Sequence, residues 1–165
     1  MPDKKTIERT EKDKREGKSA STQAGEFVRQ EIENIRKGKH GARSAKQAIA
    51  IGLSEARRAG VDLKPPEKGK VSEKTRKSAE SAYEKGQRHE PVSGTRSVAR
   101  EKALKKESTT SASHEALSKQ TRSAVKNRSS AERSEAARKA VKTKGPEELS
   151  AAAKKAARTR EQHKS

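Results

Sequence analysis

Lysine and arginine recur at fixed positions in the C-terminal part of the chain. The segments 118–128, 134–144 and 150–160 align at a period of 16 residues, with the shared pattern S-x-x-x-[RK]-x-A-[VA]-[KR]-x-[KR]. Between residues 118 and 160 there are 13 Lys or Arg and only 4 Asp or Glu. Cations in such excess neutralise phosphates and release condensed counterions, which gives affinity for nucleic acid without sequence preference. The cations expected to bind nucleic acid in these repeats are Lys119, Arg122, Lys126, Arg128, Arg138, Lys139, Lys142, Lys144, Lys154, Lys155, Arg158 and Arg160.

A second basic cluster surrounds the expected turn between two helices. Its members are Arg36, Lys37, Lys39, Arg43 and Lys46. Free backbone N–H groups at a helix N-terminus bind phosphate readily, so we expect phosphate contact here as well. A helix-turn-helix in which Arg43, Lys46 and Gln47 read bases is the alternative. Against it, the turn is longer than the usual three or four residues and no third helix is evident to support the pair.

Residues able to perform catalysis are not grouped in this sequence. His40, His89, His114 and His163 lie in separate polar segments, without the spacing of a metal site or a catalytic triad. Phosphate-binding loops, H-E-x-x-H and glycine-rich fingerprints are all missing. We therefore expect no enzyme activity, no metal, no cofactor and no small-molecule substrate.

Membrane and secretory signals are also missing. No apolar run approaches the roughly 20 residues that span a bilayer. The segment 1–18 is charged from Asp3 onward and has no apolar centre, unlike a secretory signal. The expected location is cytoplasmic and associated with the nucleoid.

The composition leaves little material for a hydrophobic core. The chain of 165 residues has one Phe, one Tyr, no Trp, no Cys and a net charge of +19, and most of its 27% hydrophobic residues are alanine. Burial stabilises by about 25 cal/mol per Å², against about 1–2 kcal/mol of entropy for each ordered residue. These values favour an all-α, largely disordered chain that is monomeric when free.

Helix signals are strongest in one small hairpin. Val28, Ile32 and Ile35 recur at helical spacing in the segment 25–36. Ser44 is expected to cap the start of a second helix, with Gln47 as its capping-box partner, and Gly60 is expected to end that helix. Gly52 would let the backbones of the two helices approach closely. The predicted organisation is a disordered arm (1–21), the helical hairpin (22–63), a linker with helical segments at 72–85 and 95–107 (64–112), and separate short helices in the basic repeats (113–165).

The segment 44–60 resembles a family of small basic bacterial proteins of unknown function. The family pattern is roughly S-[RK]-K-Q-A-I-A-I-A-L-S-E-A-R-[RK]-A-G, and this chain departs from it at Ala45 and Gly52. The resemblance implies a bacterial source and the hairpin, but no activity. The Ala-, Lys-, Arg- and Ser-rich repeats separately resemble the tails of linker-histone-like bacterial proteins, which implies nucleoid association by analogy.

Two other functions fit the same composition. Hydrophilic stress protectants of the late-embryogenesis-abundant type are also rich in Ala, Lys and Glu, although they are usually closer to neutral than +19. An RNA- or ribosome-associated basic factor would carry a similar charge excess. With only two aromatic residues for stacking, any single-strand binding would depend on charge.

Overall fold

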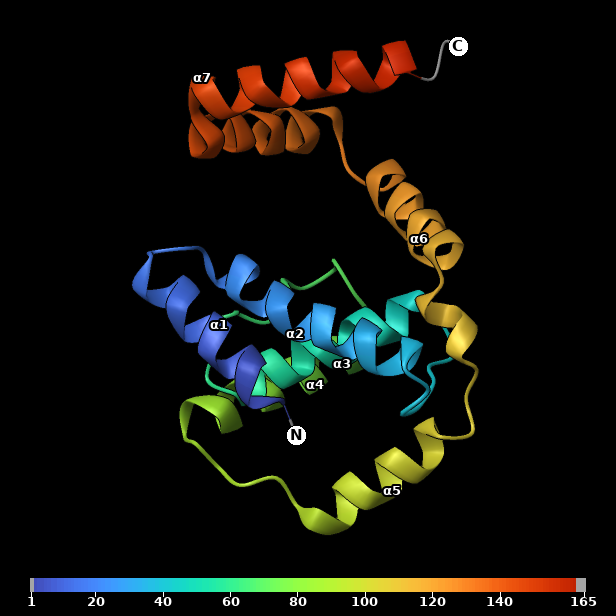
Figure 1. Ribbon diagram of the computed structural model, residues 1–165. Helices are drawn as coiled ribbons and strands as arrows, with labels where there is room; N and C mark the ends of the chain where they lie inside the picture. The colour runs from blue at the N-terminus through green and yellow to red at the C-terminus, as the bar shows by residue number, and fades with distance from the viewer. Residues whose placement is uncertain (1, 163–165) are drawn as a thin grey trace. The chain divides into compact units, whose positions relative to one another are not determined.

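The computed structural model describes residues 2–162, and α-helix dominates them from end to end (Figure 1). No β-strand forms within this described range. The residues fall into two compact units, Met1–Gln120 and Thr121–Ser165. The elements are α1 (Lys4–Arg15), α2 (Ala20–Arg36), α3 (Ala45–Arg58), α4 (Glu73–Gln87), α5 (Gly94–Leu104), the 3-10 helix η1 (Thr109–Ala112), α6 (His114–Lys126) and α7 (Ser130–Gln162).

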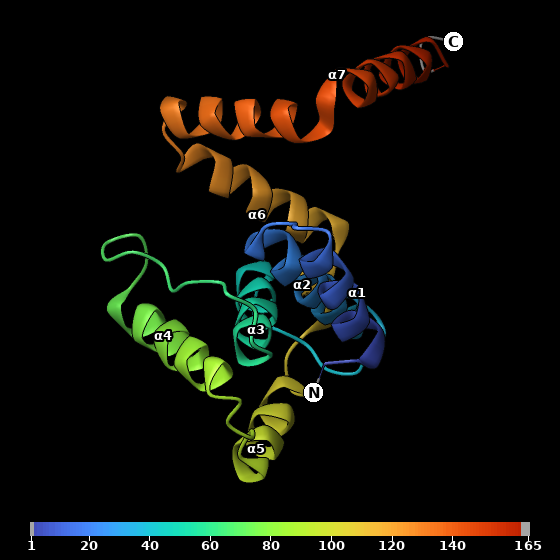
Figure 2. The same ribbon diagram turned by 90° about the vertical axis from the view of Figure 1, so that its left-hand side faces the viewer.

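The expectation of an all-helical chain is confirmed, but two finer expectations are wrong. The chain is not largely disordered, and its folded part is more than a hairpin followed by a tail. In the first unit α2 packs along α3, α1 packs on α2, and α4 packs on α3. Seen side-on, these four helices form successive layers in the order α4, α3, α2, α1 (Figure 2). The α2–α3 hairpin is therefore the centre of a larger helical unit.

The ends of the hairpin helices follow local capping chemistry. The Ser44 hydroxyl accepts a hydrogen bond from the Gln47 N–H at 3.2 Å, and the Gln47 side-chain oxygen accepts from the Arg43 N–H at 2.8 Å. Gly60 follows α3 with φ of 87°, a left-handed conformation that suits glycine. The capping signal and the stop at Gly60 are thus confirmed. Helix α2 begins earlier than expected, because the side chain of Ser19 already caps it.

Most of the buried hydrophobic residues in the first unit are alanines. Two clusters lie along the α2–α3 contact, one around Phe27 and one around Ile35. The Phe27 cluster contains Ala24, Ala56 and Val61, with Leu53 and Leu63 packed against it. The Ile35 cluster contains Ala42, Ala48 and Ala112, with Ile32 beside it. Small residues therefore form a core here because the helices approach one another closely.

Gly52 allows the close approach of α2 and α3, and Gly86 allows that of α3 and α4. A Cβ atom on Gly52 would lie 2.6 Å from the Cα of Val28, so the expected role of Gly52 is confirmed. A Cβ atom on Gly86 would lie 1.8 Å from the carbonyl oxygen of Arg57. The expected helical segment 72–85 ends just before Gly86, but Gly86 lies inside α4 and forms the contact of α4 with α3. Dense packing at such crossings gains dispersion contacts that composition alone does not reveal.

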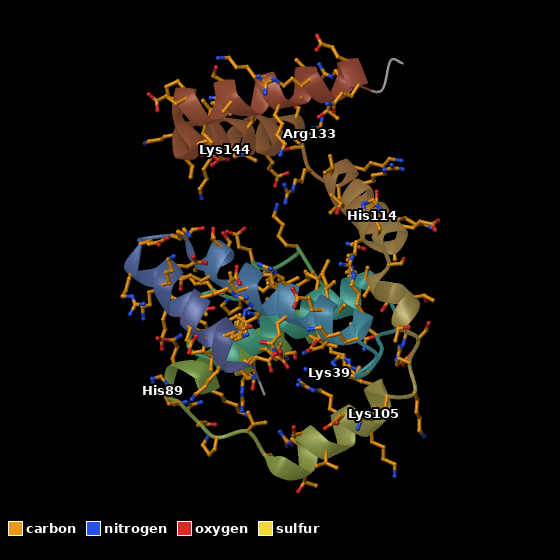
Figure 3. All side chains as sticks on the ribbon, viewed as in Figure 1. Lys39, His89, Lys105, His114, Arg133 and Lys144 are labelled. Atoms are coloured by element: carbon orange, nitrogen blue, oxygen red, sulfur yellow. The ribbon has the colours of Figure 1, made fainter. Side chains whose placement is uncertain are left out.

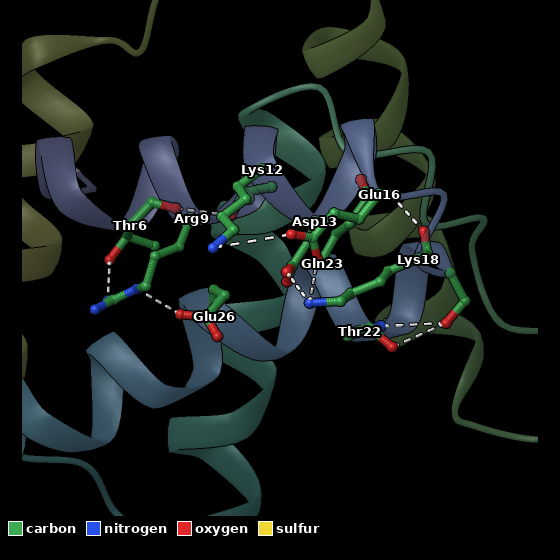
Figure 4. Close-up of polar contacts among 11 residues, drawn as sticks. Thr6, Arg9, Lys12, Asp13, Glu16, Lys18, Thr22, Gln23 and Glu26 are labelled. Atoms are coloured by element: carbon green, nitrogen blue, oxygen red, sulfur yellow. Dashed lines mark hydrogen bonds and ion pairs between the residues drawn. The ribbon is translucent and has the colours of Figure 1, made fainter. Parts of the chain in front are cut away.

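The N-terminal segment that was expected to be a disordered arm forms helix α1, which is joined to α2 by polar contacts. The Asp3 N–H donates to the Gln30 side-chain oxygen at 3.0 Å. Arg9 and Glu26 form an ion pair at 2.6 Å (Figure 4). Thr6 and Thr10 are buried on the face of α1 that contacts the core. Polar contacts replace hydrophobic ones here, which explains why the segment lacks a clear apolar period.

Residues that were expected to belong to a linker close the other end of the unit. The Gly41 N–H donates to the Leu104 carbonyl at 2.9 Å, and the Ala42 N–H donates to the Ser108 carbonyl at 3.1 Å. These bonds hold the end of α5 and the start of η1 against the loop that follows α2. Ala112 is fully buried in the Ile35 cluster as a result.

Candidate nucleic-acid interface

The second unit consists of the end of α6 and helix α7, whose boundaries are set by two local signals. Ser129 caps α7 reciprocally: the Glu132 N–H donates to the Ser129 hydroxyl at 3.2 Å, and the Ser129 N–H donates to the Glu132 carboxylate at 2.8 Å. Gly145 has φ of 74° and interrupts α7 immediately before Pro146. The helix therefore consists of two arms, 130–144 and 146–162, which run in different directions (Figures 1 and 2). One helix thus starts after the Ser129 cap and the next at Pro146.

The basic side chains of this unit are exposed and greatly outnumber its carboxylates. Within 121–162, only Gly145 and Leu149 are even partly buried. Between residues 118 and 160, 13 Lys or Arg face only 4 Asp or Glu, whereas cations of the first unit such as Arg9, Lys18 and Arg76 form ion pairs. Figure 3 shows the side chains of α7, including Arg133 and Lys144, projecting outward along the helix. The positive charge of this unit is therefore open to an external anion.

Helical spacing places one pair of these cations on the same side of each arm. Arg138 and Lys142 lie four residues apart on the first arm, and Lys154 and Arg158 do so on the second. Successive cations on one side are thus about one helical turn, roughly 5.4 Å, apart. A flexible side chain at each turn can contact a separate phosphate.

The loop between α2 and α3 carries the second predicted cluster. Lys37, Lys39 and Lys46 are exposed, and their side chains form no hydrogen bond or ion pair with any described residue. The other two members also have structural contacts. The Arg36 Nε–H donates to the Ala112 carbonyl at 2.9 Å, and Arg43 Nε lies 3.8 Å from the Glu107 carboxylate. The loop thus offers three free ammonium groups.

The helix-turn-helix alternative gains no support from Gln47. Its amide oxygen already accepts the Arg43 N–H in the cap of α3, so it is not free to contact a base. The connection from Lys37 to Ser44 also exceeds the usual turn.

Sequence reasoning missed the cations that the fold places beside this loop. Lys105 and Lys106 directly follow Leu104, whose carbonyl accepts the Gly41 N–H. Lys105 donates to the Glu101 carboxylate at 2.9 Å, and this hydrogen bond lowers the pKa of Glu101. Lys106 has no such partner among the described residues. No local signal could have revealed this proximity, because more than sixty residues separate the two segments.

Two other features, metal sites and membrane-spanning helices, are not found among the described residues. They contain no group of three or more His, Asp or Glu side chains arranged to hold a metal ion. His40 lies against Glu31, while His89 and His114 lie in other parts of the chain; His163 is outside the described residues. None of the helices within 2–162 is long and apolar enough to cross a membrane.

Comparison with known proteins identifies one family. The model of DUF6496, a family of unknown function, matches residues 11–70, which contain the C-terminal end of α1, all of α2 and α3, and the segment that follows them. No curated protein and no solved structure matches the chain.

Proposed function

We propose that this protein binds nucleic acid without sequence preference, through phosphate neutralisation by the cations of residues 119–160. One observation carries the proposal: the helices of the second unit hold exposed Lys and Arg side chains in large excess, 13 against 4 Asp or Glu between residues 118 and 160. Exposed cations one helical turn apart can each displace a counterion from a polyanion. The free lysines of the α2–α3 loop would add phosphate contacts.

The charges along each arm also favour helix formation. Glu132 and Glu135 lie near the start of the first arm, and Lys142 and Lys144 lie at its end. This arrangement stabilises the helix through its dipole. A polyanion would further stabilise the arms by screening repulsion among their cations. DNA is the first candidate partner, and RNA of similar charge density is the second.

The test is the salt dependence of duplex binding measured by fluorescence anisotropy. Log affinity should fall linearly with log salt, with a slope of about −0.9 for each phosphate contacted. A six-Gln variant of the second unit should flatten that slope by several units, up to about 5. The six substituted residues are Arg122, Lys126, Arg138, Lys142, Lys154 and Arg158.

A control with the same net charge separates position from total charge. It replaces six cations that form ion pairs in the first unit: Lys12, Lys18, Arg29, Arg76, Arg88 and Lys105. This control should change the slope much less, because those cations are already compensated. Binding that ignores salt, or equal effects of the two variants, would contradict the mechanism and favour the stress-protectant alternative.

A further inference from the structure

A cleft of about 850 Å³ opens in the first unit, and none of the cations assigned to nucleic acid line it. Its walls are formed by α1, the end of α3, α4, the segment 89–93 and the first half of α5. Phe27 and Val61, which belong to the buried core, line it as well. The cleft falls in the size range of ordinary ligand sites, roughly 300–1,000 Å³.

Exposed apolar side chains line this cleft. Ile7 is 39% exposed and Val92 is 57% exposed, and both line it. They are two of the five large hydrophobic residues that are exposed in the described chain. Helix α5, which forms one wall, has Leu104 as its one buried residue in the described structure. Ile7 and Val92 are thus the part of the apolar lining that is open to solvent.

Cations surround the same cleft. Lys14, Arg58, Lys85 and Arg96 come from α1, α3, α4 and α5 respectively. Their side chains form no hydrogen bond or ion pair with another described residue. Two of the three carboxylates that line the cleft are already paired, Glu55 with Arg100 and Glu90 with Arg88, each at 3.3 Å. The unpaired charge in the cleft is therefore predominantly positive.

These features favour one kind of occupant. Nucleic acid would place polar phosphates against an apolar lining, and Phe27, at 1% exposed, offers no surface for base stacking. A ligand with one anionic headgroup would satisfy few of four cations that come from four helices. An amphipathic segment with several carboxylates could pair with these cations and bury its apolar side chains against Ile7 and Val92.

We propose that this cleft is a docking site for an acidic, amphipathic peptide segment of a protein partner. Glutamate or aspartate side chains of the partner pair with Lys14, Arg58, Lys85 and Arg96, and its leucine-like residues cover Ile7 and Val92. Serines that line the cleft, such as Ser54 and Ser97, supply hydroxyl groups for the partner's polar atoms. The site does not depend on the proposed nucleic-acid binding, because its cations are separate from those of residues 119–160.

The probe is a labelled synthetic peptide of about 12 residues, three helical turns, with Leu along one face and Glu elsewhere. It is titrated into the full chain at about 0.15 M ionic strength, where long-range attraction is screened. Combined substitution of Arg58, Lys85 and Arg96 by Gln should weaken binding by about tenfold or more. The same change at Arg122, Lys126 and Arg138 has equal net charge and should weaken binding less than about twofold.

Two substitutions of exposed valines test whether apolar contacts contribute to peptide binding. Val92→Ser should weaken binding several-fold, whereas Val98→Ser should not, because Val98 is 66% exposed on α5 but does not line the cleft. Both positions are exposed, so neither change should impair folding. Backbone amide shifts caused by the peptide should concentrate in 7–14, 54–61 and 82–97.

Four results would overturn the proposal. The first is an equal loss of peptide affinity in the two triple-Gln variants, and the second is equal affinity for a peptide with Ser in place of Leu. The third is a set of peptide-induced amide shifts confined to 121–162. The fourth is binding of dodecanoate to the cleft without binding of the peptide. The first three would mean attraction by charge alone, and the last would mean a small amphiphilic ligand. Loss of duplex binding in the six-Gln variant would leave the peptide result unchanged, so the two proposals can fail separately.

Discussion

The Nε2 atom of His40 lies 3.5 Å from the Oε2 atom of Glu31, a carboxylate on α2 that is only 2% exposed. The other ring nitrogen of His40 lies 3.2 Å from the Gly41 carbonyl, which can only accept a hydrogen bond. The second oxygen of Glu31, Oε1, has no hydrogen-bond partner. Burial raises the pKa of Glu31 to about 7, opposed by His40 and Arg100 and assisted by Glu55.

Because the pKa of Glu31 is raised, we expect the free energy of unfolding to fall as pH rises from about 4.5 to about 7. The folded state keeps a proton on Glu31 that the unfolded chain releases near pH 4.5, so the stabilisation is complete below that pH and is lost as pH rises through the folded pKa. The loss is of the order of 3 kcal/mol. Urea unfolding at pH 5 and pH 8 measures it. Glu31→Gln should remove most of the difference; parallel pH profiles for the two proteins would contradict the assignment.

The close crossing of α2 and α3 predicts opposite effects of two Gly→Ala substitutions. Gly52→Ala places a methyl group 2.6 Å from the Cα of Val28, so the helices must separate, at a cost of about 1–3 kcal/mol. Gly25→Ala adds a methyl group where no atom lies within 4 Å, and should stabilise α2 by about 0.5–1 kcal/mol. Thermal unfolding compares them. If both variants gained stability, the crossing would have to be looser than described.

Neighbouring arginines at the end of α3 should differ greatly in importance. Arg57 is 7% exposed, and its guanidinium donates to the Leu63 carbonyl at 3.0 Å and the Lys64 carbonyl at 3.4 Å; burial lowers its pKa. Arg57→Ala leaves these carbonyls without their donor and should cost about 2–3 kcal/mol. Arg58→Ala, which removes no such bond, should change stability by less than about 0.5 kcal/mol. Chemical denaturation of both variants tests this, and equal losses would show that the Arg57 bonds contribute little.

Tyr83 reports directly on the contact between α4 and the segment after α3. Its hydroxyl donates to the Asp62 carboxylate at 2.6 Å, and this bond raises the pKa of Tyr83 above its ordinary value of 10.0. Because Tyr83 is the one tyrosine in the sequence, ultraviolet absorbance of the phenolate follows this group alone. Alkaline titration should give a midpoint above 10.0 in the wild type and a lower midpoint in Asp62→Asn. An unchanged midpoint would show that the bond is not formed in solution.

The ends of several helices could be predicted from a few consecutive residues. The caps at Ser44 and Ser129, the stop at Gly60 and the break at Gly145 were all predictable, because each is set by one side chain or one backbone conformation. The charge excess of the repeats was equally evident, since net charge requires no fold. The sequence by itself therefore determined the helical class and the basic character of residues 118–160.

Only the tertiary structure decided how these helices pack and which polar groups meet. Gly86 has the same local appearance as a helix stop, yet it forms a contact because the Arg57 carbonyl lies against it. The docking of α1, the bonds from Gly41 to Leu104 and the cleft beside Arg96 all join segments far apart in sequence. Close packing of alanine and glycine leaves no large hydrophobic residues to mark such contacts in advance. Their stability comes from backbone proximity and shape, which exist only once the helices have met.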